Sequence, residues 1–151
     1  MKVAIGSDHA GFAAKQALVP ALKKMGHSVM DLGTDGPEPC DYPDFAAQVG
    51  RAVASQEAER GILICGTGMG MGMAANKIPG VRAAVVTNEY TAEMSRHHND
   101  ANVICLGARV LPPEKIEELS RIFLAAHFEG GRHAGRVDKI TKLDCGQAPP
   151  A

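Results

Sequence analysis

Short apolar runs alternate with longer amphipathic segments along almost the whole chain. Five of the runs have the length and composition of buried strands, and they centre on residues 3–5, 29–32, 62–64, 81–86 and 103–106. Between them, apolar residues recur at intervals of three and four, which is the pattern of one buried helix face. Five consecutive strand–helix units predict an α/β domain, in which helices cover both faces of a parallel sheet.

Three signals mark helix boundaries within this pattern. Leu18 and Leu22 recur at helical spacing, but Pro20 lies between them and predicts a kink or a break, because proline removes a backbone donor. Residues 41–44 contain two aspartates that are expected to cap the next helix. The pair Pro112-Pro113 is suited to a first helical turn, and we expect the final helix to begin there.

The length and charge of the chain restrict its organisation and its partners. Its 151 residues suffice for one domain with a real core, which we place at residues 1–145, followed by a frayed tail at 146–151. A formal net charge of −1 leaves no electrostatic footprint for nucleic acid. No apolar run approaches the ~20 residues that cross a membrane, and the chain starts with a strand, so neither a membrane segment nor a secretory leader is expected.

The four cysteines, at positions 40, 65, 105 and 145, lack the spacing of a metal site. A disulfide framework is unexpected in a chain of this size, so we expect reduced thiols and a cytoplasmic location. Cys105 lies within an apolar run, and we predict an inert, buried side chain there.

Four alternating glycines follow the third apolar run, in the segment Cys65-Gly-Thr-Gly-Met-Gly-Met-Gly72. The segment is not the GxGxxG fingerprint of dinucleotide sites, since Met73 takes the place of the third glycine, and it is no P-loop, because no GK[ST] follows. Without a Cβ, alternating glycines let backbone N–H groups approach an oxyanion closely. Strand–helix packing would explain one or two glycines, so the pattern favours an anion site.

Cys65 stands at the start of this loop. A thiol near a helix N-terminus has its thiolate form favoured by the helix dipole, and it can then serve as a base or a nucleophile. A cysteine at the end of a buried strand is more often an inert apolar residue. Position alone leaves both interpretations open.

Three more polar groups are candidates for chemistry. The pair Asp8-His9 follows the first strand, where the aspartate can cap a turn and the histidine can act as acid or base. The pair His97-His98 ends the fourth helix; successive helical residues point about 100° apart, so at most one of them faces a given site. Arg132 and Arg136 form either a fork for a phosphate dianion or a solvated cluster.

The predicted sheet brings some of these groups together. Ligands of such sheets bind at the carboxyl ends of the strands, near the point where the strand order reverses. Four segments directly follow strands, namely 7–9, 65–72, 87–89 and 107–109. We therefore expect Asp8-His9 and the glycine loop to share one edge of the sheet.

Seven motifs, taken in order, resemble the type B ribose-5-phosphate isomerases and their wider family, which includes isomerases of galactose and allose 6-phosphates. The motifs are Gly6-Ser-Asp-His-Ala-Gly11, Asp41-Tyr-Pro43, Cys65-Gly-Thr-Gly68, Ala74-Ala-Asn-Lys77, Arg96-His-His-Asn-Asp100, Gly107-Ala-Arg109 and Glu129-Gly-Gly-Arg-His133. The resemblance covers residues 1–143.

This resemblance implies a Rossmann-like α/β/α sandwich with a five-stranded parallel sheet. It implies an aldose–ketose isomerase without metal or other cofactor, which interconverts ribose 5-phosphate and ribulose 5-phosphate through a cis-enediolate in the non-oxidative pentose phosphate pathway. It also implies a homodimer, in some relatives paired into a tetramer, whose active site lies at the subunit interface. The expected ligand is a phosphorylated sugar, and neither nucleic acid nor a membrane is an expected partner.

The resemblance also assigns roles by position. Cys65 is the base that moves a proton between C1 and C2, Thr67 lies beside it, and His98 opens the furanose ring, whereas His97 is incidental. One branch of the family has serine at the position of Cys65 and a glutamate base four residues later; Met69 stands there, which assigns the chain to the cysteine branch.

The implied substrate-binding residues include loop amides that hold the enediolate oxygen, a side chain for a hydroxyl (Asn99) and three arginines for the phosphate. The full set is Asp8, His9, Gly66, Thr67, Gly68, Met69, Gly70, Asn99, Arg109, Arg132 and Arg136. No metal ligand is implied.

Three alternatives stay open. A hexose 6-phosphate of allose or galactose is one, because pockets discriminate weakly against one extra hydroxymethyl group. A nucleotide-binding regulatory module would share the sheet and the loop, with Asp31 or Asp35 for a ribose hydroxyl. An inactive subunit of a hetero-oligomeric isomerase would lack parts of the site, whereas Cys65, Thr67 and His98 are all present here.

Overall fold

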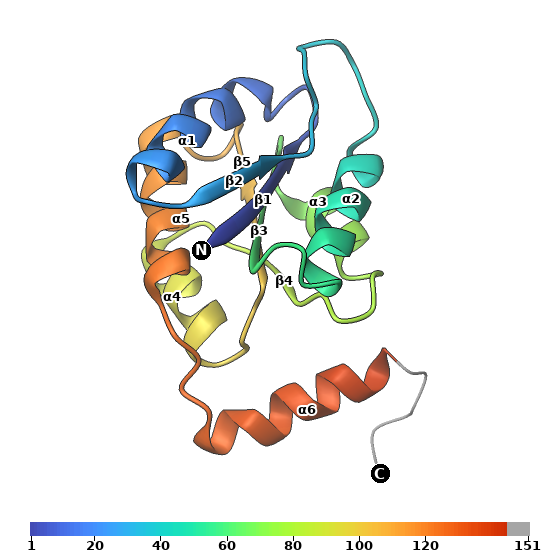
Figure 1. Cartoon of the computed structure of the whole chain (residues 1–151), viewed down its shortest axis with the longest axis vertical. Coiled ribbons are helices and arrows are strands. Elements are labelled where there is room, and N and C mark those ends of the chain that lie inside the picture. The colour runs from blue at the N-terminus through green and yellow to red at the C-terminus, as the bar shows by residue number, and fades with distance from the viewer. Residues whose placement is uncertain (145–151) are drawn as a thin grey trace.

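Five parallel strands form the central sheet of the structure, a computed structural model that describes residues 1–144 (Figure 1). The strands are β1 (Lys2–Ser7), β2 (Ser28–Asp31), β3 (Arg60–Cys65), β4 (Ala83–Val85) and β5 (Val103–Gly107), in the spatial order β2-β1-β3-β5-β4. The central strands β3 and β5 are buried on both faces, which explains their continuous apolar sequences. The predicted five-stranded parallel sheet is confirmed, and its edge strand β4 is shorter than the apolar run at 81–86.

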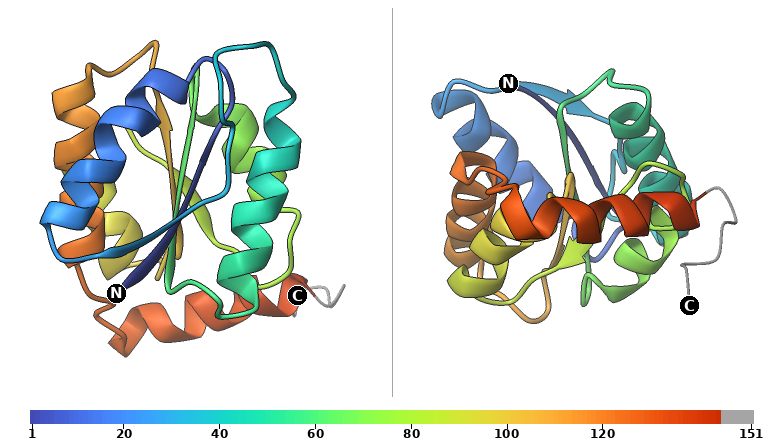
Figure 2. Two further views of the ribbon diagram at one scale, coloured as in Figure 1. Left: turned by 45° about the horizontal axis from the view of Figure 1, so that its top comes forward. Right: turned by 90° about the horizontal axis from the view of Figure 1, so that it is seen from below.

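Helices cover both faces of this sheet (Figures 1 and 2). They are α1 (Phe12–Lys24), α2 (Tyr42–Ala54), α3 (Met69–Ala75), α4 (Glu89–His97), α5 (Pro113–Ala125), the 3₁₀ helix η1 (Gly131–His133) and α6 (Ala134–Leu143). One core lies under α1, α4 and α5 and contains Leu22, Ile104 and Phe123. The other lies under α2 and α3 and contains Val49 and Leu63. The three-layer Rossmann-like sandwich is therefore also confirmed.

Two of the expected helix signals act differently in the structure. α1 continues through Pro20, and the predicted break is wrong. Pro20 and Gln16 are both exposed, so the Gln16 carbonyl that loses its intrahelical donor lies on the solvent side of the helix. Asp41 occupies the N-cap position of α2, but its side chain accepts no capping hydrogen bond. The side chain of Asn88, by contrast, caps α4 by accepting a hydrogen bond from Thr91 N over 2.9 Å.

α6 is a helix that the sequence pattern did not predict, since α5 was expected to be the last. It lies across the edge of the sheet at which β1 begins, as Figure 2 shows. Val137 is its buried residue, and near its end the Gly80 amide donates to Asp144 Oδ2 over 2.7 Å. Ile140 and Leu143 remain exposed. With a single buried apolar residue, α6 has too weak a periodic signal for sequence analysis.

The predicted tail at 146–151 lies outside the described residues, and so does Cys145. Within the described chain, Cys40, Cys65 and Cys105 are free thiols. A search of residues 1–144 finds no helix with the length and apolarity that a membrane crossing requires.

Candidate active site

The strand order reverses between β1 and β3, which places the segments after these two strands side by side. The chain leaves β1 for β2 on one side, whereas it leaves β3 for β4, which lies on the other side beyond β5. The Asp8 amide donates to the Ile64 carbonyl over 3.2 Å, so the turn after β1 is joined to β3 directly before Cys65. Such a reversal leaves a crevice at the carboxyl ends of the strands, where α/β proteins bind ligands.

Cys65 ends β3, and its thiol contacts the glycine loop. The side chain is 5% exposed, and the Gly68 amide donates to its Sγ over 3.1 Å. Gly68 is the N-cap of α3 and has a φ of +80°, a left-handed conformation in which a Cβ is strained. The contact between sulfur and amide therefore depends on glycine at position 68.

The amides of the glycine loop are used unequally. The Gly68 amide is engaged by Cys65, and the Met69 amide donates to Thr67 Oγ1 over 3.3 Å. Gly70 follows in the first turn of α3, where amides have no partner within the helix. A Cβ at position 70 would lie 2.6 Å from the Tyr42 ring, so only glycine fits there. The Gly70 amide is thus a loop donor that the hydrogen bonds of the helix leave available to an outside oxyanion.

Asp8 and His9 continue the crevice on the side of β1. Asp8 is buried and its Oδ1 accepts a hydrogen bond from Gly11 N over 3.0 Å, so the carboxylate caps the turn before α1. His9 Nδ1 accepts the Cys40 amide over 3.2 Å. Because Nδ1 is an acceptor, a neutral His9 ring carries its proton on Nε2 and can donate it to a ligand. The sequence analysis did not single out Cys40, since its contribution is a backbone group.

Arg109 reaches the same loop from the end of β5. Its amide donates to the Gly66 carbonyl over 3.0 Å, and its guanidinium lies so close to Gly66 that a Cβ there would be 3.3 Å from Nη1. Arg109 therefore supplies positive charge beside the loop.

Cys105, further back in β5, is fully buried, and burial together with the neighbouring Cys65 raises the pKa of its thiol. The predicted burial of Cys105 is confirmed, and the raised pKa disfavours the reactive thiolate form.

The other predicted site residues lie at the opposite edge of the sheet. His98 is the C-cap of α4, and residues 98–102 lead into the start of β5. The His98 ring stacks on His133 of η1, with 4.3 Å between centroids and 14° between planes. The Glu129 amide donates to the His97 carbonyl over 3.1 Å, which fastens the segment before η1 and α6 to the end of α4.

One chain thus divides the predicted site into two halves. The carboxyl edge carries Asp8, His9, the loop 65–70 and Arg109, and the amino edge carries His98, Asn99, Arg132 and Arg136. Strands β3 and β5, of six and five residues, separate the edges. At about 3.3 Å per residue the separation is roughly 16–20 Å. A single copy of the chain does not bring both halves to one small ligand.

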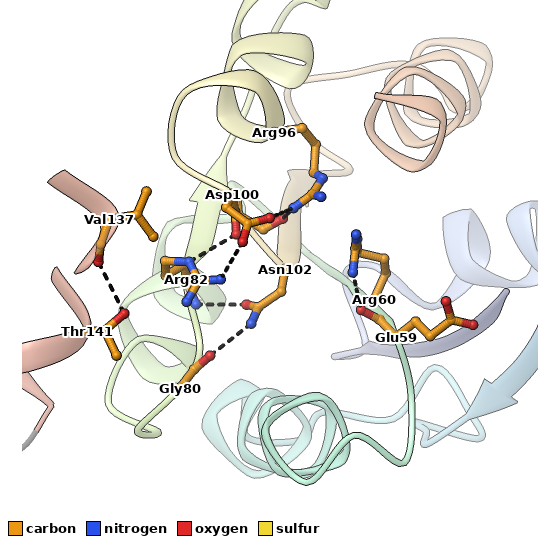
Figure 3. A network of polar contacts seen from close by, with 10 residues as sticks. Glu59, Arg60, Gly80, Arg82, Arg96, Asp100, Asn102, Val137 and Thr141 are labelled. Carbon is orange, nitrogen blue, oxygen red and sulfur yellow. Dashed lines mark hydrogen bonds and ion pairs between the residues drawn. The ribbon is translucent and has the colours of Figure 1, made fainter. Parts of the chain in front are cut away.

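Asp100 organises the segment that follows His98. Arg96 Nη1 donates to Asp100 Oδ1 over 2.7 Å, and Arg82 donates from Nη2 to Asp100 Oδ2 and from Nε to the Asp100 carbonyl (Figure 3). Asp100 has a φ of +46°, which is uncommon outside glycine, asparagine and aspartate. Sequence reasoning missed this role, although the spacing of four between Arg96 and Asp100 was a usable signal.

His98, Glu129 and His133 bring ligand atoms within 4.8 Å of one another, a set that can hold a metal ion. Their spacing in the sequence did not predict it, because they come from α4, a loop and η1. Burial, and then His98, Arg132 and Arg136, lower the pKa of His133. The same two arginines oppose a bound cation and favour an anion. The local charge therefore suits a phosphate better than a metal.

Apolar side chains are exposed around the edge strand β4. Met69 and Met73 on α3 are 58% and 69% exposed, and Val85 of β4 is also exposed. α3 packs directly against β4, since a Cβ at Gly72 would lie 2.7 Å from Val85 Cγ2. An exposed apolar face on a sheet edge is typical of a protein–protein contact.

Known proteins resemble this chain over nearly its whole length. A family model described as Ribose/Galactose Isomerase matches residues 3–140. Ribose-5-phosphate isomerase B of Escherichia coli is 47% identical over 143 residues, which cover 95% of this chain and 96% of that protein. The solved structure of Clostridium thermocellum ribose-5-phosphate isomerase B has a TM-score of 0.95 at 52% identity, with 97% and 99% of the two chains covered. Ribose-5-phosphate isomerase B from Mycoplasma genitalium with bound ribulose-5-phosphate has a TM-score of 0.93 at 42% identity, with 97% of each chain covered.

Proposed function

The chain belongs to the ribose/galactose isomerase family, and from this premise we propose that it interconverts ribose 5-phosphate and ribulose 5-phosphate. The observation that carries the proposal is the Cys65 thiol, held by the Gly68 amide at 3.1 Å beside the reversal point of the sheet. The Asp31 carboxylate is already bound by Lys15 and the Gly33 amide, which disfavours Asp31 as the ribose ligand of a nucleotide module.

The reaction begins with ring opening. His98 takes the proton of the anomeric hydroxyl and passes it to the ring oxygen, so that the C1–O bond within the ring breaks and the aldehyde forms. A histidine suits this step because its ordinary pKa lies near neutrality. Asn99, next to His98 and exposed, binds a sugar hydroxyl.

Proton transfer between carbons follows at the other half of the site. The Cys65 thiolate removes the proton from C2, and the electron pair forms the C1–C2 double bond, which leaves the charge on O1. The Gly70 amide and the flanking loop hold this oxygen. A proton passes from O2 to O1 beside the Thr67 hydroxyl, and the thiol returns its proton to C1 to give the ketose. The reaction needs no metal or other cofactor.

Two copies of the chain complete each site in this proposal. The separation of roughly 16–20 Å between the two edges supports it, because His98 of one copy then meets Cys65 of the other. The exposed apolar face of α3 and β4 and the exposed Ile140 and Leu143 of α6 supply contact surface. A two-fold dimer of this kind has two identical sites.

The phosphate lies between the copies, with Arg109 from one and Arg132 and Arg136 from the other. Guanidinium groups suit a dianion, since they donate in pairs. His9, whose Nε2 proton is free to donate, adds a further contact. The free thiols of Cys40, Cys65 and Cys105 agree with a cytoplasmic enzyme of the non-oxidative pentose phosphate pathway.

Mixing two inactive variants tests both the reaction and the shared site. Cys65→Ala and His98→Asn each lose turnover of ribose 5-phosphate when assayed alone. After subunit exchange, half of the dimers are mixed and each mixed dimer has one intact site, so about a quarter of the wild-type activity returns. If no activity returns while mixed dimers are present, the shared site is wrong.

The same turnover assay also tests which sugar phosphate is the preferred substrate. The wild-type chain is compared on ribose 5-phosphate, allose 6-phosphate and galactose 6-phosphate. Turnover of a hexose 6-phosphate with a higher kcat/KM than that of the pentose phosphate would contradict the substrate proposed here.

A further inference from the structure

A polar cavity of about 470 Å³ opens at the amino edge of the sheet, apart from the residues assigned to the isomerase site. Its wall is formed by the turn after α2, the start of β3 and the segments 80–82 and 100–102. Arg60 and Arg82 both line it, together with Gln56 (Figure 3 shows the two arginines). The volume is in the range of small-molecule sites.

Arg60 and Arg82 line this cavity together with the carboxylates of Glu59 and Asp100. Arg96, which binds Asp100, adds a third arginine nearby. Asp100 is the carboxylate between Arg82 and Arg96, and both arginines already bind it. Arg60 has no carboxylate within 4.0 Å among residues 1–144, and its Nη1 donates to the Glu59 carbonyl over 2.7 Å. The Glu59 carboxylate accepts the Lys2 amide instead. Among the described residues, the guanidinium of Arg60 therefore forms no direct ion pair, and Glu59 and Asp100 are the carboxylates nearest to it along the cavity wall.

Arg60 lies in a partly buried position near another arginine. Burial, followed by the nearby Arg96, lowers the pKa of the Arg60 guanidinium, whereas Asp100 and Glu59 oppose this shift. Arg96 is 3% exposed, and within the described chain its Nε has no hydrogen-bond partner. At the cavity itself, Arg60 uses only Nη1 in a hydrogen bond within the described chain, so an anion there can accept from its remaining donors.

We propose that this cavity is an oxyanion site for a phosphate group, free or carried by a small metabolite, and that Arg60 and Arg82 hold it. The Nε and Nη2 groups of Arg60 and the Nη1 group of Arg82 are the donors that the internal hydrogen bonds leave over. The two donor groups left on Arg60 can bind two phosphate oxygens as a pair, and Arg82 adds a single donor group. Gln56, at the rim, adds an amide donor.

The site differs from the isomerase site in every residue that it uses. The phosphate of the isomerase reaction is assigned to Arg109, Arg132 and Arg136, whereas the cavity uses Arg60 and Arg82. Binding here therefore does not depend on the proposed function, and loss of one site leaves the other testable.

Nuclear magnetic resonance on the full chain, labelled with ¹⁵N, tests the proposal with inorganic phosphate as the probe. We expect saturable shifts of the Gln56 side-chain amide and of the backbone amides of Arg60 and Arg82, which chloride at equal ionic strength does not reproduce. Arg60→Gln should weaken this binding about tenfold, which corresponds to ~1.4 kcal/mol. Glycerol 3-phosphate in place of phosphate shows whether an ester or the free ion binds more tightly.

Arg121→Gln is the matched control, since Arg121 is an exposed arginine of α5 outside the cavity. It removes the same charge and should leave the titration unchanged. If Arg60→Gln does not fold, Arg60→Lys keeps the charge and loses the paired donors, and it should also bind phosphate more weakly. Equal affinities in the Arg60 and Arg121 variants, or shifts that chloride reproduces, would overturn the proposal.

Discussion

The two edges of the sheet carry the two halves of the proposed site, and they are built by different interactions. At the carboxyl edge, backbone groups hold the functional side chains: the Gly68 amide binds Cys65, and the Cys40 amide binds His9. At the amino edge, side chains hold one another: Asp100 is bound by Arg82 and Arg96, and His98 stacks on His133.

This difference predicts that the two half-sites respond differently to substitutions, pH and salt. A half-site held by backbone amides depends on the conformation of a few loop residues and little on ionic strength. A half-site held by ion pairs and histidine rings depends on charge and therefore on pH and salt. Substitutions that alter backbone conformation and substitutions that alter charge should thus separate the two edges.

Removal of the proposed base should have the largest effect. Cys65→Ala is expected to lower kcat for ribose 5-phosphate by about 10²–10⁴-fold, because general acid–base groups contribute on that scale. Cys105→Ala is the control, since it removes a buried thiol of the neighbouring strand, and kcat per folded molecule should stay near that of the wild type. Near-normal turnover in Cys65→Ala would contradict the proposed mechanism.

A change of backbone conformation at the same edge should come next. Gly68→Ala places a Cβ in a left-handed conformation and 3.1 Å from the Leu106 carbonyl carbon, at a cost of about 1–2 kcal/mol in strain. The amide that holds Cys65 is then displaced, and kcat should fall about 10²-fold, since small misplacements of catalytic groups have effects of that size.

Gly135→Ala provides the comparison for Gly68→Ala. Gly135 lies in α6, and a Cβ added there would have no atom within 4 Å outside the local helix backbone, so alanine should raise stability by up to about 1 kcal/mol through helix propensity. Thermal unfolding and turnover of both variants are measured together. Equal turnover in the two variants would show that the conformation of Gly68 does not matter for the thiol.

Loss of the central carboxylate at the amino edge should act on stability more than on chemistry. Asp100→Ala removes the partner of the buried Arg96, and we expect unfolding in urea to require about 1–3 kcal/mol less. Asp138→Ala breaks an exposed ion pair with Lys142 and should cost under about 1 kcal/mol. If both variants lose the same stability, the network around Asp100 has no special role.

The smallest effect concerns pH. Burial, His98, Arg132 and Arg136 hold the pKa of His133 below its ordinary value. As the pH falls, this histidine is therefore protonated in the unfolded chain before it is protonated in the folded chain. Stability should therefore decrease as the pH falls from about 6.5 through the lowered folded-state pKa, and it should be fully present above that range.

Urea unfolding between about pH 7 and pH 5 measures this decrease. His133→Asn should remove part of the slope, whereas His127→Asn, at an exposed position, should leave it unchanged. An unchanged slope in His133→Asn would contradict the assignment. Within residues 1–144, the histidine stack lies at the amino edge, so this pH effect is assigned to that edge.

The half-site at the carboxyl edge could be predicted from the sequence because its parts are local. Because β3 ends at Cys65 and glycines follow directly, the glycine loop must lie at the carboxyl edge of the sheet. All strands of a parallel sheet end at that same edge. The Asp8-His9 turn follows from the same rule. By contrast, the path of α1 through Pro20 depends on which side of the helix faces water, and that is decided by packing.

By itself, the sequence determined the order of strands and helices, the parallel sheet and the motifs that identify the family, because apolar periodicity and turn residues are short-range properties. Tertiary structure decided the remainder. It placed His98, Arg132 and Arg136 at the edge opposite Cys65, formed α6, and brought Arg60 and Arg82 to the wall of one cavity. These are contacts between residues far apart in the chain, and their geometry depends on how helices pack on the sheet, which no local pattern encodes.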